Sequence, residues 1–201
     1  MAKLKAPLMS LGASGKLGDA LVFFGWKGLN VVREYVVPAN PQTALQNTQR
    51  GYLSQAVESI HGAQAWAAHL LDAADVAAYA LLGSTYAKPR TWFNQAIKII
   101  VDQLVAGKHP ILYSDGHTTP GADQLAVSIT QVSAYATAGN FHYGTSKTAL
   151  INTSAGSLAA QTWSKTISGL TTGVKYFWQF RPTAPAASIG GVSGIYYGYP
   201  T

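Results

Sequence analysis

The amino-acid sequence predicts an α+β protein in three parts. These parts are an N-terminal β-arm over residues 1–40, a helical region over 41–109 and a β-sandwich over 110–201. Two β-rich runs around a Lys-Gly pair predict the arm, and apolar residues at helical spacing predict the helices. Segments rich in Gly, Ser, Thr and Tyr, with turns about every 8–12 residues, predict the sandwich.

The arm contains the runs DALVFFGW and LNVVREYVV, joined at Lys27-Gly28, a pair suited to a tight hairpin turn. Alternate residues of a strand face opposite sides, and apolar residues fall on both sides here. A lone hairpin is marginal in water, so its own helices or another chain must cover it. We expect it to dock on a neighbouring subunit, by adding strands to a sheet edge. The expected interface comprises Leu21, Val22, Phe23, Phe24, Trp26, Val31, Arg33 and Val36.

The first helix is predicted to begin at Pro41, with Asn40 as its N-terminal cap. Its apolar stripe is formed by Leu45, Leu53, Val57 and Ile60. Gly62 predicts a break in this helix, and the segment AQAWAAHLL follows it.

Two further helices are predicted. Asp72 and Asp75 fit the start of DAADVAAYALLG, where acidic side chains favour the helix dipole, so we expect capping rather than catalysis. Gly83 fits the end of that helix. The segment RTWFNQAIKIIVDQLVAG carries a broad apolar stripe that ends at Gly107, and it predicts a helix packed along one face.

The third part contains alternating strand patterns such as KYFWQFRP, in which apolar residues recur at every second position. Leu170, Gly173 and Tyr176 stand at the L-x-x-G-x-x-Y spacing of a tyrosine corner. In that motif the phenol bonds back to upstream backbone, so we expect Tyr176 to tie down the segment before its strand.

From SITQVSAYATAGNFHYGTS to its last residue, the chain resembles a fibronectin type III domain. The segments FHYGTS, TISGLTTGVKYFWQFRP and GGVSGIYYG match the middle strands, the corner with its strand, and the last strand of that family. The resemblance implies an Ig-like, fibronectin type III-like sandwich that acts as a binding or spacer module.

The first part of the chain is similar to structural proteins of tailed bacteriophages and prophages. Their pattern is a glycine-rich start, a short hairpin ending in Arg, and P-x-N-P-x-T-x-x-Q-x-x-x-R leading into helices. In this chain the pattern is formed by Pro38, Asn40, Pro41, Thr43, Gln46 and Arg50. The resemblance implies a component of a virion.

The glycine-rich stretch at Gly12 does not have the features of a phosphate-binding loop. Gly12 and Gly15 are too close together, and Leu17 replaces the hydroxyl that holds magnesium. Ser14 lacks the strand–turn–helix setting of a hydrolase nucleophile. The glycines are better suited to bending the backbone or passing close to another backbone.

Histidine and acidic residues favour structural roles as well. Asp115 and His117 form the best polar cluster, but the Gly and Pro around them predict a turn, with metal binding as the alternative. His61 and His69 lie eight residues apart without a third ligand. The chain has no cysteine, which excludes disulfides and thiolate metal sites. We therefore expect no catalytic residue, cofactor or metal.

The net charge of +6 is unevenly distributed. Residues 1–50 carry six basic and two acidic side chains, residues 51–123 four basic and six acidic, and residues 124–201 four basic and none acidic. This pattern suits head-to-tail contact between copies, or attraction to an acidic surface. The basic residues are too sparse, and lack a known DNA-binding motif, for us to expect nucleic-acid binding.

Together these features predict a non-enzymatic structural protein of a phage-like virion, which assembles with itself and with other virion proteins. It would be made in the host cytoplasm, because MAKLKAPLMSLGASG lacks the apolar core of a signal peptide, and no run is long enough to span a membrane. Two alternatives remain open: an extracellular filament or adhesion subunit, and a DNA-associated internal virion protein.

Overall fold

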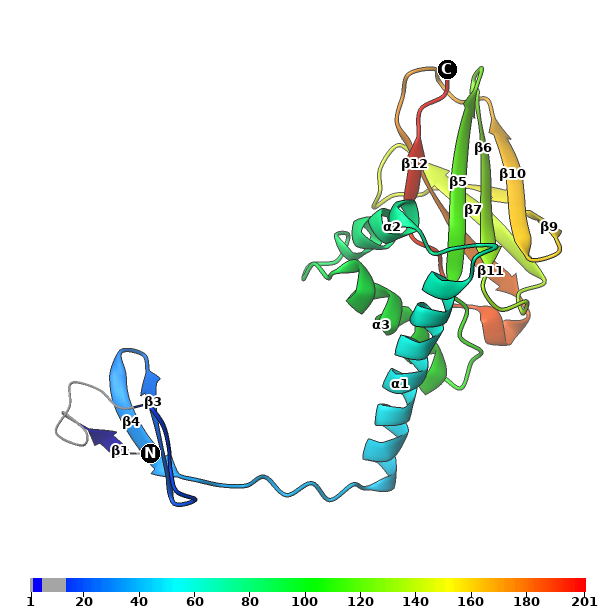
Figure 1. Cartoon of the computed structure of the whole chain (residues 1–201). Helices are drawn as coiled ribbons and strands as arrows, with labels where there is room; N and C mark the ends of the chain where they lie inside the picture. The colour runs from blue at the N-terminus through cyan, green and yellow to red at the C-terminus, as the bar shows by residue number, and fades with distance from the viewer. Residues whose placement is uncertain (1, 5–13) are drawn as a thin grey trace. The chain divides into compact units, whose positions relative to one another are not determined.

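The computed structural model describes residues 2–4 and 14–201. The chain has an α+β fold, with three helices and three antiparallel sheets among those residues (Figure 1). It divides into two compact units, residues 1–43 and 44–201. We call the sheet of the first unit the N-terminal sheet and the second unit the body. Of the glycine-rich stretch, Gly12 and residue 13 lie outside the described residues.

The N-terminal sheet contains four strands in the order β1-β4-β3-β2. Their bounds are β1 Ala2–Leu4, β2 Gly15–Leu17, β3 Leu21–Trp26 and β4 Leu29–Glu34. The turn between β3 and β4 is formed by Lys27 and Gly28, as the sequence predicts. Their φ angles of 50° and 76° are both positive, as the two central residues of a type I′ turn require.

The three helices belong to the body, and they are α1 Ala44–Ala65, α2 Ala73–Gly83 and α3 Trp92–Val105. Asp72 caps α2: its carboxylate accepts hydrogen bonds from the N–H groups of Ala74 and Asp75, at 2.8 and 3.0 Å. The predicted start of α2 and its predicted end at Gly83 are therefore confirmed. The helix α3 also lies where its apolar stripe predicts it.

The prediction for the first helix was wrong at both ends. Gln42 has a φ of 46°, outside the right-handed helical region, so Pro41 cannot open the helix. Gly62 does not break the helix but lies inside α1. A glycine in a helix costs about 1 kcal/mol relative to alanine, and the burial of Ile60 and Ala63 on either side of Gly62 offsets that cost.

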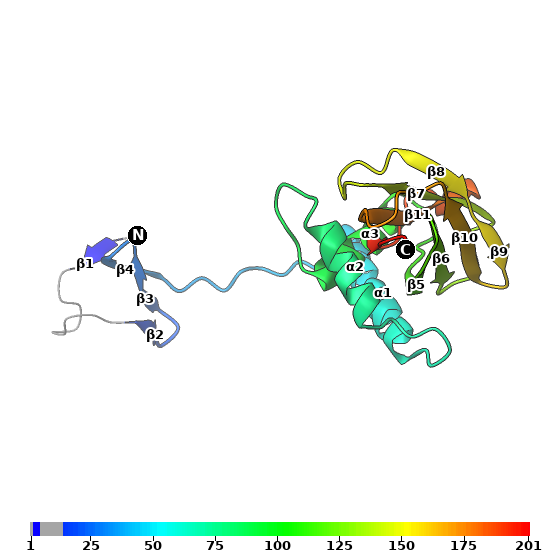
Figure 2. The same cartoon turned by 90° about the horizontal axis from the view of Figure 1, so that it is seen from above.

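The body also contains two four-stranded antiparallel sheets. One has the order β5-β6-β10-β9 and the other the order β12-β11-β7-β8. The bounds of the first are β5 Tyr113–Gly121, β6 Gln124–Gln131, β10 Thr162–Ser168 and β9 Ser157–Ala159. The bounds of the second are β12 Tyr196–Gly198, β11 Tyr176–Ala184, β7 Ala138–Gly144 and β8 Asn152–Ala155. Viewed from above, they form two layers (Figure 2).

Aromatic side chains from both sheets fill the space between the layers. The ring of Phe180 on β11 lies 4.8 Å from Trp163 on β10 and 5.3 Å from Tyr113 on β5, between centroids. Phe141 on β7 lies 5.1 Å from the same ring. All four residues are essentially inaccessible to solvent. A second cluster of apolar side chains joins the three helices to the second sheet through residues such as Phe177 and Ile195.

The prediction of a turn around Asp115 and His117 was wrong, because both residues lie in β5. The register of β5 shifts between Ser114 and His117, and Asp115 at this bulge has a φ of 56°. Gly116 is required here, since a Cβ atom would lie 2.3 Å from the ring of Tyr196. The pairing with β6 and the packing of Tyr196 therefore stabilise a strand in a segment whose residues favour a turn locally.

Candidate assembly interface

Both faces of the N-terminal sheet carry large apolar side chains, as the sequence predicts. Directly opposed residues of an antiparallel pair share a face. Phe23 is opposed to Val32, and Phe24 is opposed to Val31, so each pair belongs to a different face. A sheet with two apolar faces needs a covering layer on each side to bury them.

Among the side chains whose burial the structure describes, each face presents one exposed apolar pair. Trp26 and Leu29 are opposed beside the turn, and they are 54% and 45% exposed. Leu17 and Leu21 are opposed on the other face, and they are 51% and 37% exposed. We call these the two exposed pairs. The interface expected from the sequence did not include Leu17 and Leu29. Once the strand pairing is known, the alternation of side chains along each strand assigns both residues to a face.

The predicted interface residues do not all lie on one surface. Phe23 and Val31 are buried within the N-terminal sheet, at 8% and 5% exposure. Val22 and Phe24 are half-buried. The guanidinium of Arg33 is exposed and lies 5.6 Å from the centre of the Phe24 ring, so it covers part of that face.

The strand order bears on how the sheet can dock. β3 and β4 are the inner strands, and β1 and β2 already pair with their outer sides. Strand addition would have to use β1 or β2, which span three residues each. Such short edges are a recognised way of blocking edge-to-edge pairing. Docking through the faces of the sheet is therefore favoured over the strand addition that the sequence suggested.

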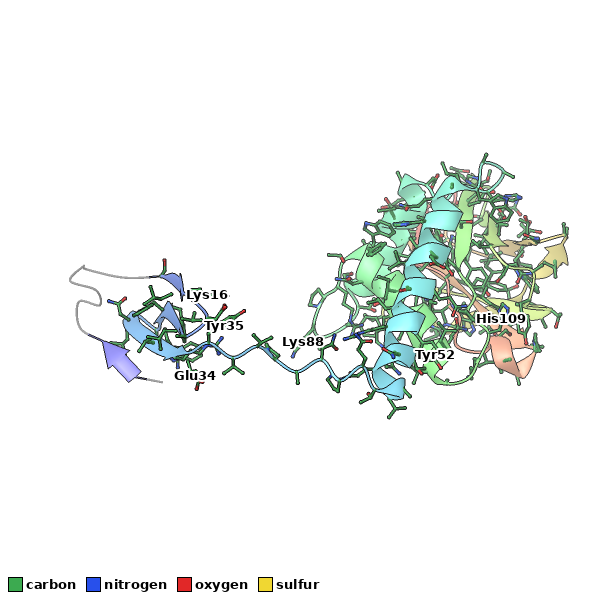
Figure 3. The ribbon with its side chains drawn as sticks, turned by 60° about the horizontal axis from the view of Figure 1, so that its bottom comes forward. Lys16, Glu34, Tyr35, Tyr52, Lys88 and His109 are labelled. Carbon is green, nitrogen blue, oxygen red and sulfur yellow. The ribbon has the colours of Figure 1, made fainter. Side chains whose placement is uncertain are left out.

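Charged side chains lie in contact at the β2 edge of the N-terminal sheet. The Lys16 ammonium lies 2.5 Å from the Asp19 carboxylate and 4.0 Å from the centre of the Tyr35 ring, and Figure 3 shows Lys16 and Tyr35 together. The backbone N–H of Tyr35 donates to the carbonyl oxygen of Ala20 at 2.8 Å, which fixes the chain after β4. Beyond it, residues 36–43 form no helix or strand, and Val36 and Val37 are 67% and 71% exposed.

The first half of α1 presents a further apolar surface. Ala56 and Ile60 on α1 are fully buried, whereas Leu53 and Leu45 of the same stripe are 50% and 80% exposed. Figure 1 shows the first turns of α1 extending beyond α2 and α3, and Figure 3 labels Tyr52 on this half. The stripe predicted from the sequence therefore exists, but only its second half is covered by the body.

The polar cluster near β5 is a set of paired groups. The Asp115 carboxylate contacts Nδ1 of His69 and Nε2 of His117, each at 2.7 Å, so both of its oxygens have partners. His61 lies elsewhere, with its ring 6.4 Å from that of Phe93. Within residues 2–4 and 14–201, no three His, Cys, Asp or Glu side chains are grouped so that they could hold a metal ion.

Asp75 has a structural role that the sequence did not reveal. Its carboxylate is fully buried and accepts hydrogen bonds from the Tyr196 hydroxyl at 2.6 Å and from the N–H groups of Asp115 and Gly116 at 2.8 and 3.0 Å. Burial raises the pKa of Asp75, and these hydrogen bonds partly oppose the shift. Asp75 thus joins α2, the β5 bulge and β12.

The residues of the predicted tyrosine corner lie before and at the start of β11. The backbone N–H of Thr171 donates to the Tyr176 hydroxyl oxygen at 3.2 Å. Leu170 is buried, and Gly173 has a φ of 76° and donates its N–H to the Pro200 carbonyl oxygen at 2.9 Å. These hydrogen bonds therefore tie the approach to β11 to the segment after β12.

Comparison of the chain with protein-family models, with curated proteins and with solved structures finds no match. Among the described helices, none is both long and apolar enough to cross a membrane.

Proposed function

We propose that this chain is a structural protein of a phage-like virion that assembles through the N-terminal sheet. The observation that carries the proposal is the pair of apolar faces, each with an exposed pair of large side chains, Trp26–Leu29 and Leu17–Leu21. Exposed apolar surface of this kind is typical of a surface that a partner covers. In this proposal neighbouring copies of the chain supply the covering layers, and the assembled copies contact other virion proteins.

The strand order of the body supports an Ig-like sandwich as its second half. In an Ig-like domain the strands A, B, E and D form one sheet and C, F and G the other, with C′ beside C in extended forms. Numbered along the chain, β5-β6-β10-β9 corresponds to A-B-E-D, and β8-β7-β11-β12 corresponds to C′-C-F-G. A module of this kind serves as the surface or spacer part of the subunit.

The tyrosine corner supports the same assignment. That motif places a tyrosine near the start of strand F, with its hydroxyl bonded to backbone a few residues upstream. Tyr176 is the first residue of β11, the strand that corresponds to F, and its hydroxyl accepts the N–H of Thr171. The buried tryptophans, however, lie on β10 and β11, whereas antibody domains place theirs on strand C.

The virion setting is supported by the resemblance in the N-terminal part. Its motif runs from Pro38 to Arg50, across the end of the first unit and the first turns of α1. Those turns expose Leu45. The motif therefore follows the N-terminal sheet and includes the exposed start of α1, as suits a segment that connects an assembling sheet to a folded body.

The test is to remove one exposed pair while retaining the sheet. The substitutions Trp26→Thr and Leu29→Thr keep strand-forming residues in place but remove two side chains worth about 1.5–3 kcal/mol each when buried. We expect the dissociation constant of the assembly to rise by about 100-fold or more. The measurement is the mass of the full-length chain in solution by sedimentation.

The matched control is Ile151→Thr, which removes an exposed apolar side chain, 81% accessible, from the body. We expect this variant to assemble like the unaltered chain. If both variants assemble normally, the exposed pair beside the turn is not an interface, and the proposed mechanism fails.

A further inference from the structure

The body contains a cavity of about 650 Å³ that the proposed assembly does not use. It lies between the end of α2 with the loop that follows, the outer face of β7 and β11, the β7–β8 loop and the segment before β12. Ligand cavities in proteins are commonly about 300–1,000 Å³, so this one has the size of a small-molecule site.

The lining of this cavity is basic. Lys147 and Arg181 supply positive charge to it, and none of the lining residues is Asp or Glu. Residues 124–201 contain no acidic side chain at all, so the sheet segments around the cavity supply no carboxylate to neutralise these groups. Among the described residues, neither Lys147 nor Arg181 forms a salt bridge.

The guanidinium of Arg181 is held in place on one side only. Its Nε donates to Oε1 of Gln179 at 2.9 Å, and the buried Gln179 amide in turn donates from Nε2 to the Ser193 carbonyl oxygen at 2.8 Å. Within the described part of the chain, the two terminal nitrogens of Arg181 have no hydrogen-bond acceptor. This arrangement orients the group while leaving its fork of donors available for a planar anion.

Lys147 and His142 approach the cavity from different segments. Lys147 on the β7–β8 loop donates from Nζ to the Ser84 hydroxyl at 2.9 Å, which places its ammonium beside the end of α2. His142 is directly opposed to Gln179 in the β7–β11 register, so it shares a sheet face with Arg181. Burial lowers the pKa of His142, and the charge of Arg181 lowers it further, so the imidazole offers hydrogen-bonding groups but little positive charge near neutral pH.

The uncharged part of the lining suits a ring that carries hydroxyl groups. Thr148 and Thr183 supply hydroxyls, and Leu82 and Val192 supply apolar surface. Tyr86 also lines the cavity, and the guanidinium of Arg90 lies 4.5 Å from the centre of its ring. Arg90 thus adds positive charge next to the cavity without entering it.

We propose that this cavity binds an acidic sugar, whose carboxylate or phosphate lies against Arg181 and Lys147 and whose ring lies against Tyr86 and Leu82. The bidentate geometry of a guanidinium fits either anionic group. The hydroxyls of the threonines hydrogen-bond to the sugar hydroxyls. The proposal concerns the body alone and is independent of assembly through the N-terminal sheet.

The experiment titrates the full-length chain with glucuronate, with glucose 1-phosphate and with glucose, followed by calorimetry or protein NMR. We expect at least one acidic sugar to bind. Binding of one alone identifies the anionic group, and equal binding of both shows that the site accepts either group. Glucose is expected to show no binding under the same conditions. Inorganic phosphate is expected to bind at least tenfold more weakly than the better sugar, because it lacks the ring.

Two variants on separate segments assign the site. Arg181→Gln and Lys147→Gln are each expected to weaken binding at least tenfold, whereas Lys165→Gln, which removes the same charge from β10, should leave it unchanged. Thermal melting of each variant checks that it is folded. The proposal is overturned if neither acidic sugar binds, if glucose or phosphate binds equally well, or if both cavity variants bind like the unaltered chain.

Discussion

Trp26 and Trp178 show that the two units of this chain differ in how far their aromatic side chains are exposed to solvent. Trp178 on β11 is fully buried, stacks on Tyr196 at 4.5 Å between ring centres, and donates its Nε1 hydrogen to the Thr118 hydroxyl at 2.8 Å. Trp26 on β3 is 54% exposed and lies opposite Leu29, which is 45% exposed.

The difference comes from the number of layers. The body stacks one sheet on another and adds helices on the outside, so the aromatic side chains between its sheets are covered from both sides. The described N-terminal sheet has strands on both sides of its central hairpin but leaves apolar side chains open on both faces. The body thus has the features of a unit that is stable alone, and the sheet has those of a unit completed by contact.

The largest expected effect is at Trp178. Trp178→Ala leaves a cavity between the two sheets and an unpaired hydroxyl on Thr118, so the free energy of unfolding of the body should fall by about 3–5 kcal/mol. Trp26→Ala should change it by less than about 0.5 kcal/mol. Chemical denaturation followed by circular dichroism measures both values, and similar losses in the two variants would break the comparison.

A smaller loss is expected when the polar connection within the body is weakened. Asp75→Asn retains the shape of the side chain, but its amide group meets backbone N–H donors, so we expect a loss of about 2–3 kcal/mol. The matched control is Asp102→Asn on the exposed face of α3, which should change stability by about 0.5 kcal/mol or less.

The effect of Asp75 also depends on pH. Burial raises the pKa of Asp75 above its ordinary value of 3.8. When the pH lies between 3.8 and the raised pKa, the folded state therefore holds a proton that the unfolded state has released. The stabilising contribution of this group is therefore present at low pH and is lost as the pH rises through the raised pKa. The stability gap between the unaltered chain and Asp75→Asn should narrow over that interval, and a widening gap would contradict the assignment.

The smallest effects come from two buried tyrosines that touch each other. The Tyr79 hydroxyl donates to the Tyr113 carbonyl oxygen at 3.1 Å and accepts the Tyr113 N–H at 3.2 Å. The Tyr113 hydroxyl is buried without a hydrogen-bond partner among the described residues. Tyr79→Phe should cost about 1–2 kcal/mol, whereas Tyr113→Phe should be neutral or slightly stabilising. Equal decreases in the melting temperatures of the two variants would contradict this prediction, because they would show that the two hydroxyls contribute equally to stability.

The sequence predicted the elements whose signals are local. The cap at Asp72, the end of α2 at Gly83 and the stripe of α3 each depend on residues within a few positions of one another. It did not predict β5, because Gly116 and Pro120 indicate a turn when taken alone. The strand forms because Tyr196 packs over Gly116 and because Pro120 lies on an edge strand, where proline is tolerated.

The candidate sites also combine features that have a local sequence signal with features that depend on contacts between distant segments. Period-2 spacing was enough to predict two apolar faces in the N-terminal sheet, but which side chains remain exposed depends on the pairing of β2 with β3. The basic cavity could not be predicted, since Tyr86, Lys147 and Arg181 come from three segments without any common spacing. Only the packing of α2 on the second sheet brings them together.

The most direct test of the assembly account is the mass of the full-length chain in solution, measured over a wide range of concentration beside a chain that begins at residue 44. The account predicts that the full-length chain forms multimers as its concentration rises, while the shortened chain remains a folded monomer with the body intact. A full-length chain that stays a monomer at every concentration, or a shortened chain that multimerises equally well, would contradict it.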